Sequence, residues 1–202
     1  MKEQQTSVLI VGGGVGGCAA ALAVAQAGQH AILTEECDWI GGQLTSQAVP
    51  PDEHGWIERY GCTASYRRWR QGVRDYYRSF YPLSPAARTM PFLNPGQGWV
   101  SPLCHEPRVA LAVLEGLLAP FLSQGVLTIW REHKVNAVEV VSNRVRAAQV
   151  TDLRIGRTFT VEADYVLDAT ELGELLPLAG AEFVTGFESQ AMTGEPSAPA
   201  EY

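Results

Sequence analysis

The stretch VLIVGGGVGGCAAALAVAQAGQHAILTE, residues 8–35, decides the fold. Four aliphatic residues are followed by a burst of glycines, a small-residue segment rich in alanine, and a second apolar run that ends at Glu35. Short aliphatic runs on either side of a longer Ala-rich segment predict a strand, a tight turn, a helix and a second strand. This order is typical of a parallel α/β sheet.

The glycines in this stretch have the spacing of a dinucleotide-binding loop. Gly12, Gly14 and Gly17 match G-x-G-x-x-G, in which the first glycine allows a sharp turn, the second lets the backbone approach a pyrophosphate, and the third lets the helix pack closely. The start of the helix then presents unpaired N–H groups and a partial positive charge to the phosphates. A glycine-rich turn with a purely structural role is the alternative.

An acid follows at the position expected for ribose recognition. Glu35 ends the second apolar run, where a carboxylate can accept hydrogen bonds from ribose hydroxyls. The same charge would repel a 2′-phosphate, so NADP is disfavoured relative to NAD or FAD. A strand before the loop, a helix after it and an acid beyond it together favour a dinucleotide site.

Charge and hydropathy exclude several classes of function. The 202 residues include 15 basic and 22 acidic side chains, a net charge of −7 that argues against binding nucleic acid or an anionic membrane. Residues 8–27 are uncharged and imitate a signal peptide, but five glycines between Gly12 and Gly17 would disrupt its helical core. We therefore expect neither a signal peptide nor a membrane span, and a cytoplasmic location.

The cysteines indicate separate reduced thiols. Cys18, Cys37, Cys62 and Cys104 are widely spaced and include no C-x-x-C pair. This spacing argues against a dithiol redox motif, a zinc ribbon or a local iron–sulfur ligand run. No metal site is expected.

The remaining chain predicts an inserted segment followed by a return to strands. Residues 65–80 have the apolar stripe of a helix with Thr63 as a possible N-cap, and their arginines fit either a clamp for an anionic substrate or, as we favour, a solvated basic face. Residues 82–107 are rich in Pro and Gly and predict a long irregular loop. A helix is expected over 107–124, a strand over 126–130, an antiparallel meander over 135–141, 144–151 and 158–162, and a last buried strand over 165–168.

These elements predict an α/β fold: a doubly wound, Rossmann-like parallel sheet with a three-stranded β-meander and a small inserted lobe. We expect the first βαβ unit of a nucleotide-binding domain in residues 1–45, the inserted lobe in 46–105, the continuation of that domain in 106–185, and a polar tail in 186–202.

Two later motifs resemble those of flavoproteins. WIGGQLTS (residues 39–46) resembles the glycine-doublet motif of FAD enzymes in the glutathione-reductase-type superfamily, although Trp39 and Gln43 stand where arginines are frequent. DATELG (residues 168–173) resembles the late motif whose backbone passes near the cofactor. GCTASYRRWR (61–70), GWVSPLCHEPRVALAVLE (98–115) and DATELGELLPLAG (168–180) are similar to FAD-dependent oxidoreductases of the heterodisulfide-reductase-A-like group.

The resemblance implies FAD as cofactor and hydride transfer between an unidentified small-molecule substrate and flavin N5. It places Gly42 and Gln43 in the phosphate wall beside Gly12, Gly14 and Gly17, with Glu35 at the ribose, Val135 offering backbone contacts to adenine, and Ala169 and Thr170 closing the site. It names no catalytic residue. It also implies that a later segment, or a partner subunit, covers the flavin end.

Two other functions remain open. An NAD-binding dehydrogenase explains the first glycine unit equally well, but it accounts for neither the Gly41–Gly42 doublet nor the meander before DATELG. A non-catalytic nucleotide-binding fragment is the second alternative.

Overall fold

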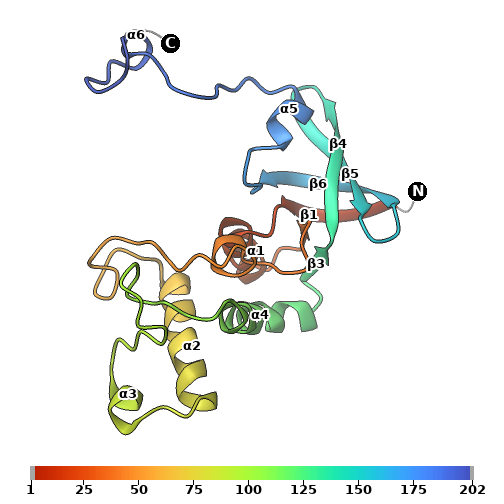
Figure 1. The fold of residues 1–202 in the computed structure, drawn as a ribbon. Coiled ribbons are helices and arrows are strands. Elements are labelled where there is room, and N and C mark those ends of the chain that lie inside the picture. Colours follow the sequence, from red (N-terminus) through yellow and green to blue (C-terminus); the bar gives the residue numbers. More distant parts are fainter. Residues whose placement is uncertain (1–2, 201–202) are drawn as a thin grey trace.

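The computed structural model describes residues 3–200, which form a six-stranded mixed sheet flanked by helices (Figure 1). The strands are β1 (Glu3–Val11), β2 (Ala31–Glu35), β3 (Leu127–Arg131), β4 (His133–Val141), β5 (Arg144–Asp152) and β6 (Arg157–Asp168). The helices are α1 (Val15–Gln26), the 3-10 turn η1 (Gly42–Leu44), α2 (Ala64–Phe80), α3 (Pro85–Thr89), α4 (Pro107–Ser123), α5 (Leu175–Ala179) and α6 (Gln190–Thr193).

The strand order is β3-β2-β1-β6-β5-β4. The β1–β2, β2–β3 and β1–β6 pairs are parallel, whereas β4–β5 and β5–β6 are antiparallel. The predicted α/β class, with a Rossmann-like sheet and a β-meander, is therefore confirmed. Because the chain runs outward from β1 to β3 and later returns to β6 on the other side of β1, the sheet has its topological switch point between β1 and β6.

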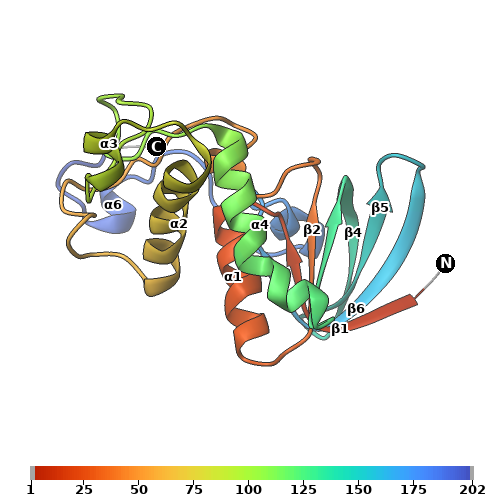
Figure 2. The same ribbon diagram turned by 90° about the horizontal axis from the view of Figure 1, so that it is seen from below.

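Alternate residues at the end of β1 are buried on opposite faces of the sheet. Val8 and Ile10 pack with α1 and α4, which lie across one face (Figure 2). Leu9 and Val11 point the other way and pack with Val135, Ala148 and other side chains of β4, β5, β6 and α5. A strand buried on both faces is continuously apolar, as residues 8–11 are.

One strand is longer than predicted. The sequence predicts a break between a meander strand at 158–162 and a buried strand at 165–168, but β6 runs unbroken through both. Residues 157–162 pair antiparallel with β5, while residues 160–168 pair parallel with β1. The strand stays extended because each half pairs with a different neighbouring strand. The antiparallel meander and the parallel strands therefore form one continuous sheet.

Residues 46–105, the predicted inserted lobe, contact α4 through α2. Trp69, Val73 and Tyr77 of α2 share a hydrophobic cluster with Val109 and Ala110 of α4. Thr63 caps α2, since its side chain accepts a hydrogen bond from the Tyr66 N–H, as predicted. The expected loop after α2 contains the short helix α3.

The expectation of a solvated basic face on α2 is wrong for two arginines. Arg70 and Arg74 are only 1% and 2% exposed. Arg70 forms ion pairs with Glu53 and Glu58, and Arg74 pairs with Glu58. The acids come from the loop before α2, and their charges neutralise the buried guanidinium groups, so these arginines do not form a clamp for an anionic substrate either.

Candidate functional site

The candidate site lies where β1, β2 and β6 end. Gly12 N–H donates to the Thr34 carbonyl (3.0 Å), and Ala169 N–H donates to the Val11 carbonyl (2.8 Å). The first glycine loop, the ribose acid and the late Ala-Thr motif thus lie together at the carboxyl ends of these three strands, on one edge of the sheet. Ligands of open α/β sheets bind outside the carboxyl ends of strands at the switch point, which is this edge.

Gly12 and Gly17 are required by the packing of the protein itself. Gly12 has φ +99°, and a Cβ there would lie 2.3 Å from the Ala169 carbonyl oxygen. A Cβ on Gly17 would lie 1.9 Å from the Gly12 carbonyl oxygen. The start of α1 therefore rests directly on the end of β1, which only a residue without a side chain permits.

Gly14 is different, because its environment leaves room for a side chain. Its φ of −62° and ψ of −173° are accessible to any residue. A Cβ there would meet one atom within 4 Å, Glu171 Oε1 at 3.4 Å, and Gly14 lines a cavity. A side chain at Gly14 would therefore obstruct only a ligand that enters the cavity.

The glycine doublet packs against the first glycine loop. Gly41 N–H donates to the Gly13 carbonyl oxygen at 2.7 Å. A Cβ built on Gly42 would lie 3.1 Å from the Cα of Gly14, and both doublet residues have positive φ. The two glycine turns are thus one structure, and we refer to Gly12, Gly14 and Gly42 as the glycine cradle.

Two carboxylates hold the loops around the glycine cradle. Glu35 accepts hydrogen bonds from the Gly13 and Cys37 N–H groups, one on each oxygen, both at 2.8 Å. Asp168 accepts from the Thr170 N–H and hydroxyl on Oδ1 and from the Leu175 N–H on Oδ2. Thr170 Oγ1 in turn accepts from the Glu174 N–H (2.8 Å). Asp168, which sequence reasoning did not single out, therefore shapes the loop that follows β6.

A cavity of about 210 Å³ opens at the glycine cradle. Most of the predicted site residues line it: Gly12, Gly14, Glu35, Gly42, Val135, Ala169 and Thr170. Gly17 and Gln43 are not among the lining residues: Gly17 is buried in the first turn of α1, against Gly12, and Gln43 is exposed. Gln47, four residues on, lines the cavity where Gln43 was expected.

The cavity also has lining residues that were not predicted. They are Glu36, Cys37, Ser46, Gln47, His133, Lys134, Glu171, Leu172, Glu174, Leu175 and the strand residues Val11 and Thr34. Several are sequence neighbours of predicted residues, and this proximity was the signal in the sequence that could have identified them. Lys134 crosses the cavity rim, with Nζ 2.9 Å from Glu36 and 3.2 Å from Glu174. Hydrogen bonds to these two carboxylates raise the pKa of Lys134.

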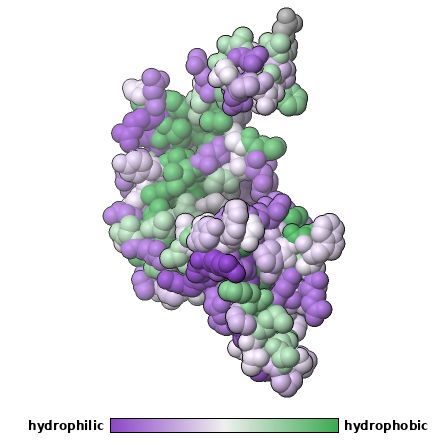
Figure 3. Space-filling view, turned by 90° about the vertical axis from the view of Figure 1, so that its left-hand side faces the viewer, coloured by the Kyte–Doolittle hydropathy of each residue, from purple (hydrophilic) through white to green (hydrophobic). Residues whose placement is uncertain are grey.

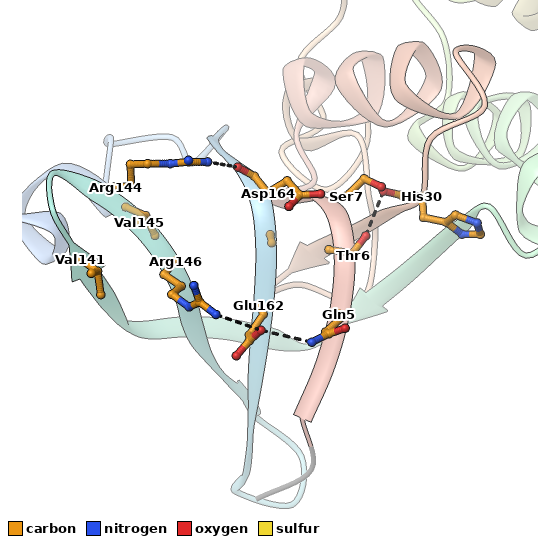
Figure 4. A pocket seen from close by; sticks show the side chains of 11 residues that line it. Gln5, Thr6, Ser7, His30, Val141, Arg144, Val145, Arg146, Glu162 and Asp164 are labelled. Carbon is orange, nitrogen blue, oxygen red and sulfur yellow. Dashed lines mark hydrogen bonds and ion pairs between the residues drawn. The ribbon is translucent and has the colours of Figure 1, made fainter.

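A larger hollow of about 610 Å³ lies at the opposite end of β1 and is a poorer candidate (Figure 4). Its two arginines and Glu162 have partners within the sheet: Arg146 lies 3.9 Å from Glu162, which also accepts a hydrogen bond from Gln5 (3.2 Å), and Arg144 donates to the Asp164 carbonyl. It contains no glycine turn and lies at the amino end of β1, away from the switch point.

A family model described as FAD dependent oxidoreductase matches residues 7–201. The chain belongs to the FAD dependent oxidoreductase family. FAD is accordingly its cofactor, and the predicted cofactor is confirmed.

Two solved structures agree with this chain in fold. The chain resembles the FAD-bound glycerol-3-phosphate dehydrogenase of Bacillus halodurans (TM-score 0.56, 17% identity, 89% of this chain and 37% of that one). It also resembles a geranylgeranyl bacteriochlorophyll reductase-like protein of Thermoplasma acidophilum (TM-score 0.51, 17% identity, 91% and 44%). L-amino acid oxidase of Cerastes cerastes is 37% identical over 81 residues, 38% of this chain and 15% of that protein. The chain thus spans less than half the length of each.

The residues at the glycine cradle fit FAD. The first N–H groups of α1 have no partner within the helix, and no side chain caps this end. Backbone without side chains faces the cavity at Gly14 and Gly42, which is the condition for close approach of a diphosphate.

Among residues 3–200, no helix is both long and apolar enough to cross a membrane.

Proposed function

We propose that this chain binds the adenosine diphosphate half of FAD and forms part of an oxidoreductase that transfers a hydride between a small-molecule substrate and flavin N5. The observation that carries the proposal is the hydrogen bond from Gly41 to Gly13, which joins the two glycine turns at the switch point of the sheet. An NAD-binding dehydrogenase is not favoured, since the family match is to FAD dependent oxidoreductases.

In this proposal each group has a separate task. The glycine cradle and the α1 N-terminus bind the diphosphate, Glu35 accepts hydrogen bonds from the ribose, and the Val135 backbone contacts adenine. Ala169 and Thr170 close the other wall. When bound, FAD supplies the two-electron chemistry, while the protein orients the ring and excludes water.

The rest of the cofactor and the substrate require more surface than this cavity provides. A volume of about 210 Å³ is below the roughly 300–1,000 Å³ typical of pockets for drug-sized ligands. Apolar surface is visible between the C-terminal segment and the inserted lobe (Figure 3). Exposed apolar side chains include Leu172 (85%), Val184 (70%) and Phe187 (78%). We propose that a further segment of protein, or a partner subunit, covers the flavin end and completes the substrate pocket.

Two finer assignments are part of the same proposal. The phrases at 61–70, 98–115 and 168–180 support membership of the heterodisulfide-reductase-A-like group within the family. We also propose a cytoplasmic location, on the grounds that the glycines interrupt the only signal-like stretch. The similarity to L-amino acid oxidase covers too little of that protein to indicate a substrate.

The test is the visible absorption spectrum of the purified chain before and after FAD is added, followed by titrations with FAD, NAD and NADP. FAD should bind more tightly than NADP, but weakly enough to be lost in part during gel filtration, because the surface that would cover the flavin end is not part of this cavity. Tighter binding of NADP would contradict the proposal. Tightly held FAD that a substrate bleaches would overturn the proposal that a further segment or a partner subunit completes the site.

A further inference from the structure

Glu171 places a carboxylate over the meeting point of the two glycine turns. Its Oε1 lies 3.4 Å from the Cβ position of Gly14 and 3.3 Å from that of Gly42. These Cβ positions mark the directions in which the two glycines lack a side chain. The space that glycine leaves for a diphosphate is therefore partly taken by a negatively charged side chain of the same protein.

Gln47 holds the Glu171 carboxylate in this position. Gln47 Nε2 donates a hydrogen bond to Glu171 Oε1 at 3.2 Å. The two residues belong to different loops, one after η1 and one after β6, and both line the cavity. The partner is a neutral amide, whereas Lys134, the basic side chain at the rim, is bonded to Glu36 and Glu174.

Only the side chain of Glu171 has to move to reopen the space. The backbone on either side of it is anchored, because Asp168 binds the Thr170 and Leu175 N–H groups and Thr170 binds the Glu174 N–H. The Glu171 side chain itself is exposed, so it can turn toward solvent while the loop stays in place.

We propose that Glu171 is a negative determinant of diphosphate binding: in the ligand-free chain its carboxylate, held by Gln47, occupies the diphosphate position, and FAD must displace it. This inference rests on the proposed binding of FAD at the glycine cradle. A carboxylate and a diphosphate that compete for one space repel each other, and only ligands that carry the diphosphate feel this repulsion.

The test compares three ligands on three proteins. FAD, ADP and adenosine are titrated by calorimetry into the wild-type chain, Glu171→Gln and the control Glu139→Gln, which removes an exposed charge from β4. Glu171→Gln keeps the shape and loses the charge, so the Kd of FAD and of ADP should fall about tenfold, equivalent to about 1.4 kcal/mol. Adenosine binding should not change, and the control should match the wild type.

Each remaining outcome separates this inference from the proposed function. Unchanged or weaker FAD binding by Glu171→Gln would overturn the role of Glu171 while leaving FAD binding intact. An equal gain for adenosine would also overturn it, since the diphosphate would then not be the group repelled. If neither wild type nor Glu171→Gln binds FAD or ADP, the proposed function itself fails. Binding by Glu171→Gln alone would support both.

Discussion

Glu35, the last residue of β2, accepts a hydrogen bond from the backbone N–H of Gly13, with 2.8 Å between Oε2 and the nitrogen. The acid expected at the ribose therefore also fixes the glycine loop that ends β1. Its other oxygen accepts from Cys37, so a single carboxylate sets the shape of two neighbouring turns. A carboxylate oxygen can accept more than one hydrogen bond, and ribose hydroxyls can share it.

Replacing Glu35 by Arg should weaken FAD binding. The variant loses the expected ribose hydrogen bonds and the anchor of Gly13, and hydrogen bonds to a charged group contribute about 1.5–3 kcal/mol. We expect the FAD Kd to rise at least about tenfold, measured by quenching of flavin fluorescence. Asp38→Arg, an equal change of charge in the next loop, is the control. Equal FAD affinities of Glu35→Arg and wild type would show that Glu35 does not contribute to FAD binding.

Gly14→Val and Gly17→Ala should fail in opposite ways. Valine fits the backbone angles at Gly14, so the protein should keep its helical content and Tm while a branched side chain blocks the diphosphate. Alanine at Gly17 collides with the Gly12 carbonyl, and such overpacking costs about 1–3 kcal/mol of unfolding free energy. Circular dichroism, thermal melts and FAD titration distinguish the two. Unchanged FAD affinity in folded Gly14→Val would show that Gly14 does not face the phosphates.

Arg70→Met should destabilise the inserted lobe. The guanidinium is buried and ion-paired with Glu53 and Glu58, so its removal leaves the half-buried Glu53 without an ion-pair partner, while Glu58 keeps Arg74. Breaking a buried pair from one side costs about 3–5 kcal/mol. Arg68→Met, on the exposed face of the same helix, should change the unfolding free energy by less than about 0.5 kcal/mol. Similar values for the two variants in urea denaturation would show that the pairs do not hold the lobe.

The same cluster should make stability fall in acid. Burial raises the pKa of Glu58, but hydrogen bonds from Arg74 and Arg70 outweigh it and lower the pKa below the ordinary 4.5. A carboxyl with a depressed folded-state pKa contributes stability above its unfolded pKa and loses it as the pH falls through the folded value. The Tm of wild type should therefore drop below about pH 4.5, more steeply than that of Glu58→Gln. Parallel pH profiles would contradict this.

FAD should protect Cys37 from alkylation. Cys37 is exposed and lines the cavity, so bound cofactor should slow its reaction, followed by peptide mass spectrometry. Cys62 and Cys104 are not among the lining residues and serve as controls. Cys18 should stay unreactive at pH 8, because burial raises the pKa of its thiol to about 12. Equal protection of all three accessible cysteines would indicate a change in the fold rather than a footprint of FAD.

Much of the architecture could be predicted because it depends on local spacing. The aliphatic run at 8–11, the glycines at 12–17 and the acid at 35 specify strand, turn, helix and strand through backbone preferences that act over a few residues. The cap at Thr63 follows from the same short-range chemistry. The family phrases added FAD, which residue spacing alone could not choose over NAD.

The tertiary structure decided what depends on contacts between distant segments. Arg70 and Arg74 are buried because Glu53 and Glu58 reach them from another loop, which helical periodicity cannot show. β6 runs unbroken because two different strands pair with it. Glu171 lies over Gly14 only because the end of β6 returns beside β1. The sequence by itself thus determined the turns and the class of cofactor, since these follow from local backbone geometry and motif, whereas the partners of charged side chains were decided by which loops the sheet brings together.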